Sequence, residues 1–284
     1  MALYELAEHL PELHDAVIVA SFDGWVDAAE AASGAVAQIA GDGQVVASFD
    51  ADALFDFRSR RPVLDVTDGR LTDLHWPELT LRHTRADGRD LLVFLGAEPD
   101  FRWQELAGDV TELAQQLGVA QWISLGAVPA AVPHTKPVPM MATASEDGLL
   151  AADSTGPEGL LRVPSAALSV LEIAVTSAGT PAVGFYAQVP PYASLGYAAA
   201  SIALIERLSR HLGVVFELDE LMEEERDQHA RYDAAMDSDP VLRETVSRLE
   251  AVSGDAEAER LPSGDELASE IERFLRGQPD EPSP

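Results

Sequence analysis

Carboxylates gather directly after the first apolar run of the chain. Asp23 and Asp27 stand on either side of Gly24 and Trp25, and Glu30 follows three residues later. Carboxylates in this position can cap the helix that follows, where the helix dipole stabilises them. They can also bind a divalent cation or transfer a proton, if the loop lines a crevice. Both interpretations stay open.

Three arginines follow two aspartates in the segment D-A-L-F-D-F-R-S-R-R-P, residues 52–62. Ion pairs within the segment are the simplest explanation. Arginine also binds carboxylates and phosphates through two parallel hydrogen bonds. Arg58 and Arg61 are therefore candidates for an anion site or for a contact with another subunit.

Two further candidates follow later apolar runs. Glu98, in the loop that starts at Gly96, could bind a ribose hydroxyl or a partner's backbone, or it could be a turn carboxylate without a role. His134 lies near the single lysine, Lys136, in a loop stiffened by prolines. Because histidine titrates near neutral pH, His134 could act as an acid or a base.

Several familiar sites are absent from the sequence. It contains no cysteine, no H-x-x-x-H or H-E-x-x-H pair, no G-x-G-x-x-G and no G-K-[ST] motif. Thiolate, zincin, dinucleotide and P-loop sites are therefore not indicated, and we expect no cofactor and no metal of these types.

Short apolar runs alternate with segments of helical periodicity. Strands are expected at 17–22, 44–50, 122–125 and 181–186, with a hairpin over 79–95 that turns at Asp87-Gly88. Helices are expected at 28–40, 103–117, 165–177 and 194–212, with Ser165 as a candidate N-cap. The six prolines within 126–164 predict an irregular connection.

This alternation predicts an α/β fold with a largely parallel or mixed sheet flanked by helices. The loops after the strands of such a sheet meet at one edge, where ligands bind. Four loops fit that position, at 23–27, 96–100, 126–137 and 187–192.

The last quarter of the chain is acidic. Residues 217–284 contain 21 Asp and Glu against 7 Lys and Arg. Helices are expected at 217–236, at 240–252 and from Ser263 onward, so we divide the chain into an α/β domain, 1–215, and an acidic helical extension, 216–284. A solvated helical surface explains this charge; an arm for a basic partner is the alternative.

The formal charge of −30 repels phosphate backbones and anionic membranes, so neither nucleic acid nor a membrane is an expected partner. The first residues show no basic and apolar signal pattern, and no apolar stretch reaches about 18 residues. We expect a cytoplasmic protein.

In order along the chain, several segments resemble the actinobacterial branch of the PAC2 (proteasome assembly chaperone 2-like) family. They are D-G-W-V-D-A-A-E-A-A from 23, D-x-x-x-D-F-R-x-R-R-P from 52, G-A-E-P-D from 96, the loop 126–137 with P-H-T, V-P-S from 163 and V-P-P-Y from 189. The resemblance implies a nucleoside phosphorylase-like core, a cytoplasmic setting and a homo-oligomer. No phosphorylase catalytic set maps onto the chain.

Two functions are compatible with these features. The first is a non-enzymatic binding protein, similar to proteasome-assembly chaperones, that docks another protein or its own copies. The second is an enzyme or sensor for a nucleoside- or phosphate-type small molecule. The residues that would form the pocket or binding surface are Asp23, Gly24, Trp25, Asp27, Glu30, Arg58, Arg61, Gly96, Glu98, Gly126, His134 and Tyr192.

Overall fold

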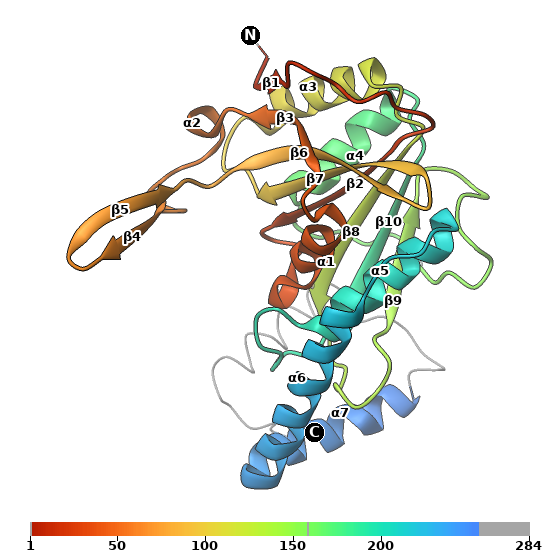
Figure 1. The fold of residues 1–284 in the computed structure, drawn as a ribbon. Coiled ribbons are helices and arrows are strands. Elements are labelled where there is room, and N and C mark those ends of the chain that lie inside the picture. Colours follow the sequence, from red (N-terminus) through yellow and green to blue (C-terminus); the bar gives the residue numbers. More distant parts are fainter. Residues whose placement is uncertain (1, 158, 256–284) are drawn as a thin grey trace.

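The computed structural model describes residues 2–157 and 159–255. In this part of the chain, a mixed sheet of eight strands has the order β1-β3-β6-β7-β2-β8-β10-β9 (Figure 1). The strands are β1 (Tyr4–Leu6), β2 (Val17–Asp23), β3 (Gln44–Phe49), β6 (Leu79–Ala86), β7 (Arg89–Ala97), β8 (Gln121–Pro129), β9 (Met140–Ala144) and β10 (Ala182–Val189).

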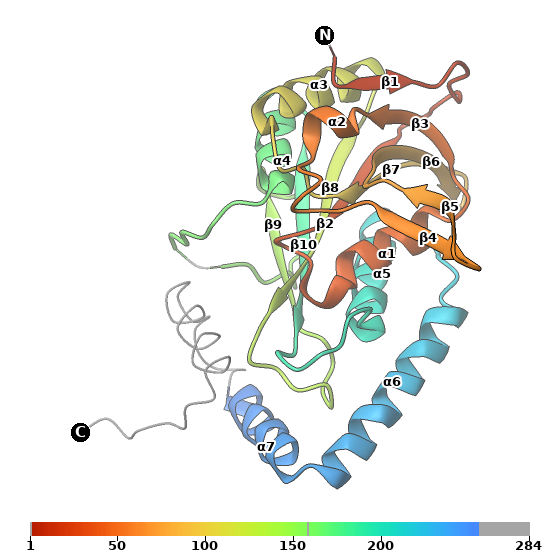
Figure 2. The same ribbon diagram turned by 90° about the vertical axis from the view of Figure 1, so that its left-hand side faces the viewer.

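Four neighbouring strands in the middle of the sheet, β7, β2, β8 and β10, run parallel. β6 and β9 run antiparallel to their neighbours on either side of this group. Helices α3 (Trp103–Gln116) and α4 (Ala167–Ser177) cover one face, and α1 (Ala31–Ala40) and α5 (Ala198–Leu212) cover the other (Figures 1 and 2). The predicted α/β fold with a mixed, helix-flanked sheet is confirmed; its likeness to nucleoside phosphorylases stays a prediction.

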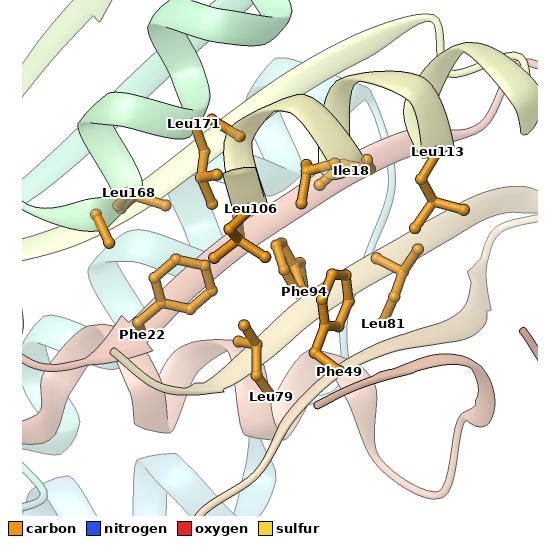
Figure 3. Close-up of a cluster of buried hydrophobic side chains, with 14 of the residues drawn as sticks. Ile18, Phe22, Phe49, Leu79, Leu81, Phe94, Leu106, Leu113, Leu168 and Leu171 are labelled. Carbon is orange, nitrogen blue, oxygen red and sulfur yellow. The ribbon is translucent and has the colours of Figure 1, made fainter. Parts of the chain in front are cut away.

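Side chains alternate between the two faces of the central strands, as expected for strands buried on both sides. Ile18 and Phe22 of β2 pack on the α3/α4 side, beside Leu106 and Leu168 of those helices (Figure 3). Phe94 of β7 makes edge contact with Phe22, with ring centroids 5.1 Å apart. The apolar runs of the sequence are therefore the interior of the sheet.

The expected strands at 17–22 and 44–50 and the helix between them form β2, α1 and β3, but two other strands lie between β2 and β3 in the sheet. The hairpin β6–β7, which turns at Asp87-Gly88 as predicted, fills the space between them. The helix also starts later than the predicted residue 28. Residues 28–30 form a short 3₁₀ turn (η1), and Ala29 and Glu30 both have φ of +54°, which interrupts a continuous α-helix.

Four strands and a short helix were not predicted. β1 and β9 lie at the two edges of the sheet, and β9 falls inside the proline-rich connection expected to be irregular. A separate hairpin of β4 (Val63–Thr67) and β5 (Arg70–His75) follows the four-residue helix α2 (Ala51–Leu54). Asp68 and Gly69 turn this hairpin with φ of +51° and +76°, the same Asp-Gly chemistry as in β6–β7.

Helices α6 (Asp219–Ser238) and α7 (Pro240–Asp255) form the described part of the acidic extension. α6 contacts the α1/α5 side of the core through Leu221 and Tyr232, and Asp239 caps α7 by accepting a hydrogen bond from the Val241 N–H at 2.9 Å. The helix predicted from Ser263 lies outside the described residues, and the boundary between 215 and 216 stays a prediction. No described helix has the length and apolar character to cross a bilayer.

A buried polar chain connects β8 with α4. The Trp122 indole N–H donates to Ser124 Oγ at 2.8 Å, and the Ser124 hydroxyl donates to Glu172 Oε2 at 2.5 Å. Burial raises the pKa of Glu172, and the hydrogen bond from Ser124 opposes this shift only in part. The folded protein therefore holds a proton on Glu172 more tightly than the unfolded chain does.

We expect Glu172→Gln to raise the free energy of unfolding near pH 8 and to change it little near pH 4.5. An acid with a raised folded pKa contributes stability below its usual value of 4.5, and loses that stability as the pH rises through the folded pKa. Glutamine keeps the acceptor for Ser124 without the buried charge. Urea unfolding at both pH values measures the effect.

Glu206→Gln on the exposed side of α5 is the control for charge removal, and it should have little effect at either pH. The same stabilisation by Glu172→Gln at both pH values would contradict the assignment.

Candidate functional site

The four central parallel strands end at one rim of the sheet (Figure 1). The register pairs Asp23 of β2 with Ala97 of β7, and Val189 of β10 with Pro129 of β8. The loops that follow these strands are the four that the sequence analysis predicts to meet at one edge of the sheet. Their side chains form two groups, which we describe in turn.

Glu98 connects three elements of the rim. Its Oε2 accepts a hydrogen bond from the Trp25 N–H at 2.8 Å, and its Oε1 accepts one from the Ala167 N–H at 2.7 Å. Its own amide donates to the carbonyl of Asp23 at 3.0 Å. One carboxylate thus holds the loop after β2 against the end of β7 and caps the N-terminus of α4.

Ser165, the predicted cap of α4, does not cap it. The helix begins at Ala167, and the Ser165 hydroxyl donates instead to the carbonyl of Ala166 at 3.1 Å. The cap comes from Glu98, 69 residues earlier in the chain. A negative charge at this position also suits the helix dipole.

Glycines let the backbone pass close to neighbouring groups at this rim. A Cβ on Gly24 would lie 2.5 Å from Cβ of Glu98, and a Cβ on Gly96 would lie 2.1 Å from the carbonyl oxygen of Glu78. Gly126 lies against the ring of Tyr186, which a Cβ would approach to 2.5 Å. The predicted glycines are thus positions of close packing.

An arginine also reaches this group. Arg60 donates through Nη1 to Asp23 Oδ2 at 2.5 Å and through Nη2 to the Asp23 carbonyl at 2.9 Å. Of the two arginines singled out from the sequence, Arg58 is 87% exposed and pairs with Asp56, and Arg61 is exposed. The sequence showed an arginine cluster but gave no signal for which member turns inward.

Asp27 acts as the cap of α1. Its Oδ1 accepts hydrogen bonds from the N–H groups of Ala32 at 2.8 Å and Ser33 at 3.0 Å, so the capping interpretation is confirmed. Burial raises the pKa of Asp27 against the opposing effect of these bonds. Its Oδ2 is buried and has no hydrogen-bond partner among the described residues. Glu30, three residues on, is exposed.

The second group surrounds His134. The Tyr192 hydroxyl accepts a hydrogen bond from the His134 backbone N–H at 2.9 Å and lies 2.8 Å from His134 Nδ1. The tautomer of the imidazole decides which of these two atoms donates. The rings of Tyr232 and His229, both on α6, lie 4.9 and 5.2 Å from the imidazole. His134 is therefore closed in by the loop after β10 and by α6.

The His134 imidazole is 1% exposed. Its Nε2 lies 3.8 Å from Asp233 Oδ1, too far for a hydrogen bond, and has no partner among the described residues. Burial lowers the pKa of His134; nearby His229 lowers it further, while Asp233 and Glu250 oppose the shift. The folded state thus favours the neutral imidazole.

α7 binds the same loop. The Thr135 hydroxyl donates to Glu250 Oε1 at 2.5 Å, and Lys136 Nζ donates to the Glu250 carbonyl at 2.8 Å. A hollow of about 390 Å³ lies between α6 and α7. It is lined by Asp233, Met236, Asp237, Arg243, Val246, Ser247 and Glu250, and by none of the residues predicted for the site.

The Glu98 group (Asp23, Gly24, Trp25, Arg60 and Glu98) and the His134 group (His134, Tyr192, His229, Tyr232 and Asp233) share the rim. No hydrogen bond or ion pair between described residues joins the two groups. The described residues also contain no cluster of three or more His, Asp or Glu placed to hold a metal ion. A common role for the twelve predicted residues stays a prediction.

The sequence pattern missed the α6 contribution. His229 and Asp233 stand four residues apart, which places them on one helix face, with Nδ1 and Oδ2 3.3 Å apart. The four-residue spacing of His229 and Asp233 was the one sequence feature that could have indicated a polar site on α6. Nothing in the local sequence shows that this face turns toward His134.

The chain is similar to proteins of one family. The model of the PAC2 family matches residues 21–236, a range that includes most of α6. No curated protein matches.

Three solved structures are similar at 31% to 34% sequence identity. A Mycobacterium tuberculosis protein of unknown function has a TM-score of 0.84 and 33% identity, over 90% of this chain and 92% of that one. A PAC2 family protein from Streptomyces avermitilis has a TM-score of 0.72 and 34% identity, over 83% of this chain and 99% of that one. A proteasome-assembly chaperone homologue from Mycobacterium tuberculosis has a TM-score of 0.73 and 31% identity, over 81% of this chain and 99% of that one.

We expect Glu98→Ala to lower the free energy of unfolding by about 1–3 kcal/mol, because it leaves two backbone N–H groups without their charged acceptor. Urea unfolding of the full chain measures this loss. Ser165→Ala is the matched control, and it should change stability little, since Ser165 does not cap α4. Equal effects of the two substitutions would contradict the role of Glu98.

We expect acidification to loosen α6. A histidine with a lowered folded pKa contributes stability above its usual value of 6.5, and loses it as the pH falls from 6.5 toward the folded pKa. Hydrogen exchange in α6, corrected for the intrinsic rate, should therefore be faster near pH 5.5 than near pH 7.5, and His134→Gln should remove the difference.

His211 provides the control, because burial also lowers its pKa but it lies on α5, against Gln121. His211→Gln should leave the pH dependence of α6 in place. Exchange in α6 that changes equally with pH in the wild type and in His134→Gln would contradict the assignment.

Proposed function

The chain belongs to the PAC2 family, and we propose that it is a non-enzymatic protein-binding member that acts like a proteasome-assembly chaperone. The similar Mycobacterium tuberculosis structure described as a proteasome-assembly chaperone homologue supports this proposal. The proposed setting is the cytoplasm.

One observation carries the proposal: Glu98 and Asp27 hold backbone N–H groups, and the His134 imidazole is buried. Both carboxylate oxygens of Glu98 accept backbone N–H groups, Asp27 caps α1, and His134 is buried under α6. A general acid or base needs access to a substrate proton. The small-molecule alternative therefore gains no support from these contacts.

Two large apolar side chains are exposed at the rim. Trp25 is 64% exposed and Phe101 is 48% exposed, in the loops that follow the neighbouring strands β2 and β7. Tryptophan is strongly enriched among residues that dominate protein–protein binding. Because Glu98 fixes the backbone of Trp25, the indole is presented from an ordered loop, which lowers the entropic cost of binding.

We expect affinity capture with the tagged full chain, from lysate of the cells that produce it, to enrich proteasome subunits. Trp25→Ala should weaken this enrichment by about 30-fold, the loss for removing a residue worth about 2 kcal/mol. Quantitative mass spectrometry of the captured proteins measures it.

Ile173→Ala is the matched control, since Ile173 is 67% exposed on α4, away from the rim loops. Its capture should equal that of the wild type. Recovery of the bait alone, or unchanged capture by Trp25→Ala, would contradict the proposed function.

A further inference from the structure

Two arginines and a histidine gather at the edge of the sheet opposite the rim. Arg89 and Gln121 are the first residues of β7 and β8, so they lie at the amino-terminal ends of strands whose carboxyl ends form the rim. Arg207 and His211 stand four residues apart on α5, and His211 Nε2 lies 2.9 Å from Gln121 Oε1. We call Arg89, Arg207 and His211 the basic cluster.

Shared contacts hold the basic cluster together. The ring of Phe185 on β10 packs against both members on α5, with its centroid 5.0 Å from Arg207 Cζ and 5.4 Å from the centroid of the His211 ring. Arg89 Nη1 donates to the carbonyl of Leu212, the next residue in the chain, at 3.5 Å. Burial lowers the pKa of His211, and the charges of Arg207 and Arg89 lower it further. Both guanidinium groups therefore lie close to one imidazole.

The two guanidinium groups lack close carboxylate partners. Arg89 is half-buried, its Nε is buried without a hydrogen-bond partner, and no described acid forms an ion pair with it. The Arg207 side chain is 12% exposed, and the acid nearest to it, Asp153, is 82% exposed and 3.8 Å away. Removing a charge from water is costly unless a counter-charge and hydrogen bonds compensate it. An exposed carboxylate at that distance compensates little.

The carboxyl end of α5 explains only part of the basic cluster. Cations are stabilised in the last turn of a helix, which accounts for Arg210 and for the bond from Arg89 to the Leu212 carbonyl. Arg207 stands more than one turn before that end, and its Nη2 donates to the Ser154 hydroxyl instead of a helix carbonyl. Neither Arg207 nor Nε of Arg89 is explained by the helix dipole.

The chemistry of these groups suits an oxyanion. A guanidinium group binds phosphate oxygens through parallel N–H bonds. Two guanidinium charges match a phosphate dianion, and the Ser154 hydroxyl and the Gln121 amide beside them can donate further hydrogen bonds. Because the net charge of −30 repels anions at long range, binding here depends on these short-range contacts.

We propose that Arg89 and Arg207 together bind a phosphate dianion, either the free ion or the phosphate group of a small molecule. The site lies at the opposite edge of the sheet from Trp25, so it goes beyond the proposed function and can fail without it. The exposed carboxylate of Asp153 lies beside the same guanidinium group and opposes the binding of an anion there.

Isothermal titration of the full chain with inorganic phosphate, at constant ionic strength, tests the site. The wild type should bind with a saturable dissociation constant. Arg207→Gln should raise that constant at least about 10-fold, because it removes charge-assisted hydrogen bonds. Arg210→Gln is the matched control, since it removes the same charge from an arginine of α5 that is 62% exposed, and it should leave the constant nearly unchanged.

Asp153→Asn tests the site without removing a binding group. Because Asp153 is exposed, the substitution should leave folding intact. It should lower the dissociation constant for phosphate by about 2- to 5-fold, the strength of an exposed charge pair. Glu146→Gln, which removes an exposed carboxylate from the same connection, should not tighten binding.

Arginine side-chain NMR gives a direct readout. The Nε–H signal of Arg89, assigned by its loss in Arg89→Lys, should shift when phosphate is added, since this donor has no partner among the described residues. The signal of Arg58, which is 87% exposed and pairs with Asp56, should move no more than it does with sodium chloride.

Methyl phosphate, titrated in the same way, distinguishes the two sources of the anion. Tighter binding than that of inorganic phosphate would assign the site to the phosphate group of a larger molecule, and weaker binding would assign it to the free ion. No saturable binding of either probe, or equal losses in Arg207→Gln and Arg210→Gln, would overturn the proposal. If Arg207→Gln lowers the melting temperature, Asp153→Asn and the Arg89 signal decide.

Discussion

Backbone N–H groups bound to two carboxylates determine the shape of the rim. Asp27 binds the first turn of α1, and Glu98 binds both the loop after β2 and the first turn of α4. Helix starts leave such N–H groups without intrahelical partners. Each carboxylate therefore positions the start of a helix relative to the end of a strand. The position of the exposed Trp25 side chain follows from this arrangement, because Glu98 binds the Trp25 N–H.

Where the determining interactions are local, the sequence predicted the structure. The strands of the core and the Asp87-Gly88 turn follow from apolar runs and turn chemistry, and Asp27 lies five residues before Ala32, whose N–H it binds. The cap of α4 could not be predicted in this way. Glu98 and Ala167 are 69 residues apart, and a plausible local cap, Ser165, stood beside the helix.

The hairpin β4–β5 shows a different limit. Its Asp68-Gly69 turn is as clear a hairpin signal as Asp87-Gly88, and both pairs have positive φ. Residues 64–67 alternate apolar and polar side chains, but Leu71 and Leu74 stand three residues apart, so β5 lacks the strict alternation of a half-buried strand. The structure has the strands but leaves Leu71 and its neighbours exposed. A sequence pattern records that a face is apolar and says nothing of whether the same chain covers it.

The acidic extension is part of the rim, although its composition is that of a solvated helix. α6 places Tyr232 and Asp233 against His134, and α7 receives the single lysine, Lys136, through Glu250. The chain thus uses its scarce basic and imidazole groups where its acidic helices meet the core. Lys136 supplies a charge-assisted hydrogen bond to a carbonyl of α7, whereas the His134 imidazole, whose pKa is lowered, contributes by packing against α6. Gln228 of α6 adds a second attachment, because its side chain accepts a hydrogen bond from the Ala198 N–H at 3.1 Å and donates one to the Gly196 carbonyl at 2.6 Å. The extension therefore docks both on the loop 134–136 and on the start of α5, and its composition shows neither contact.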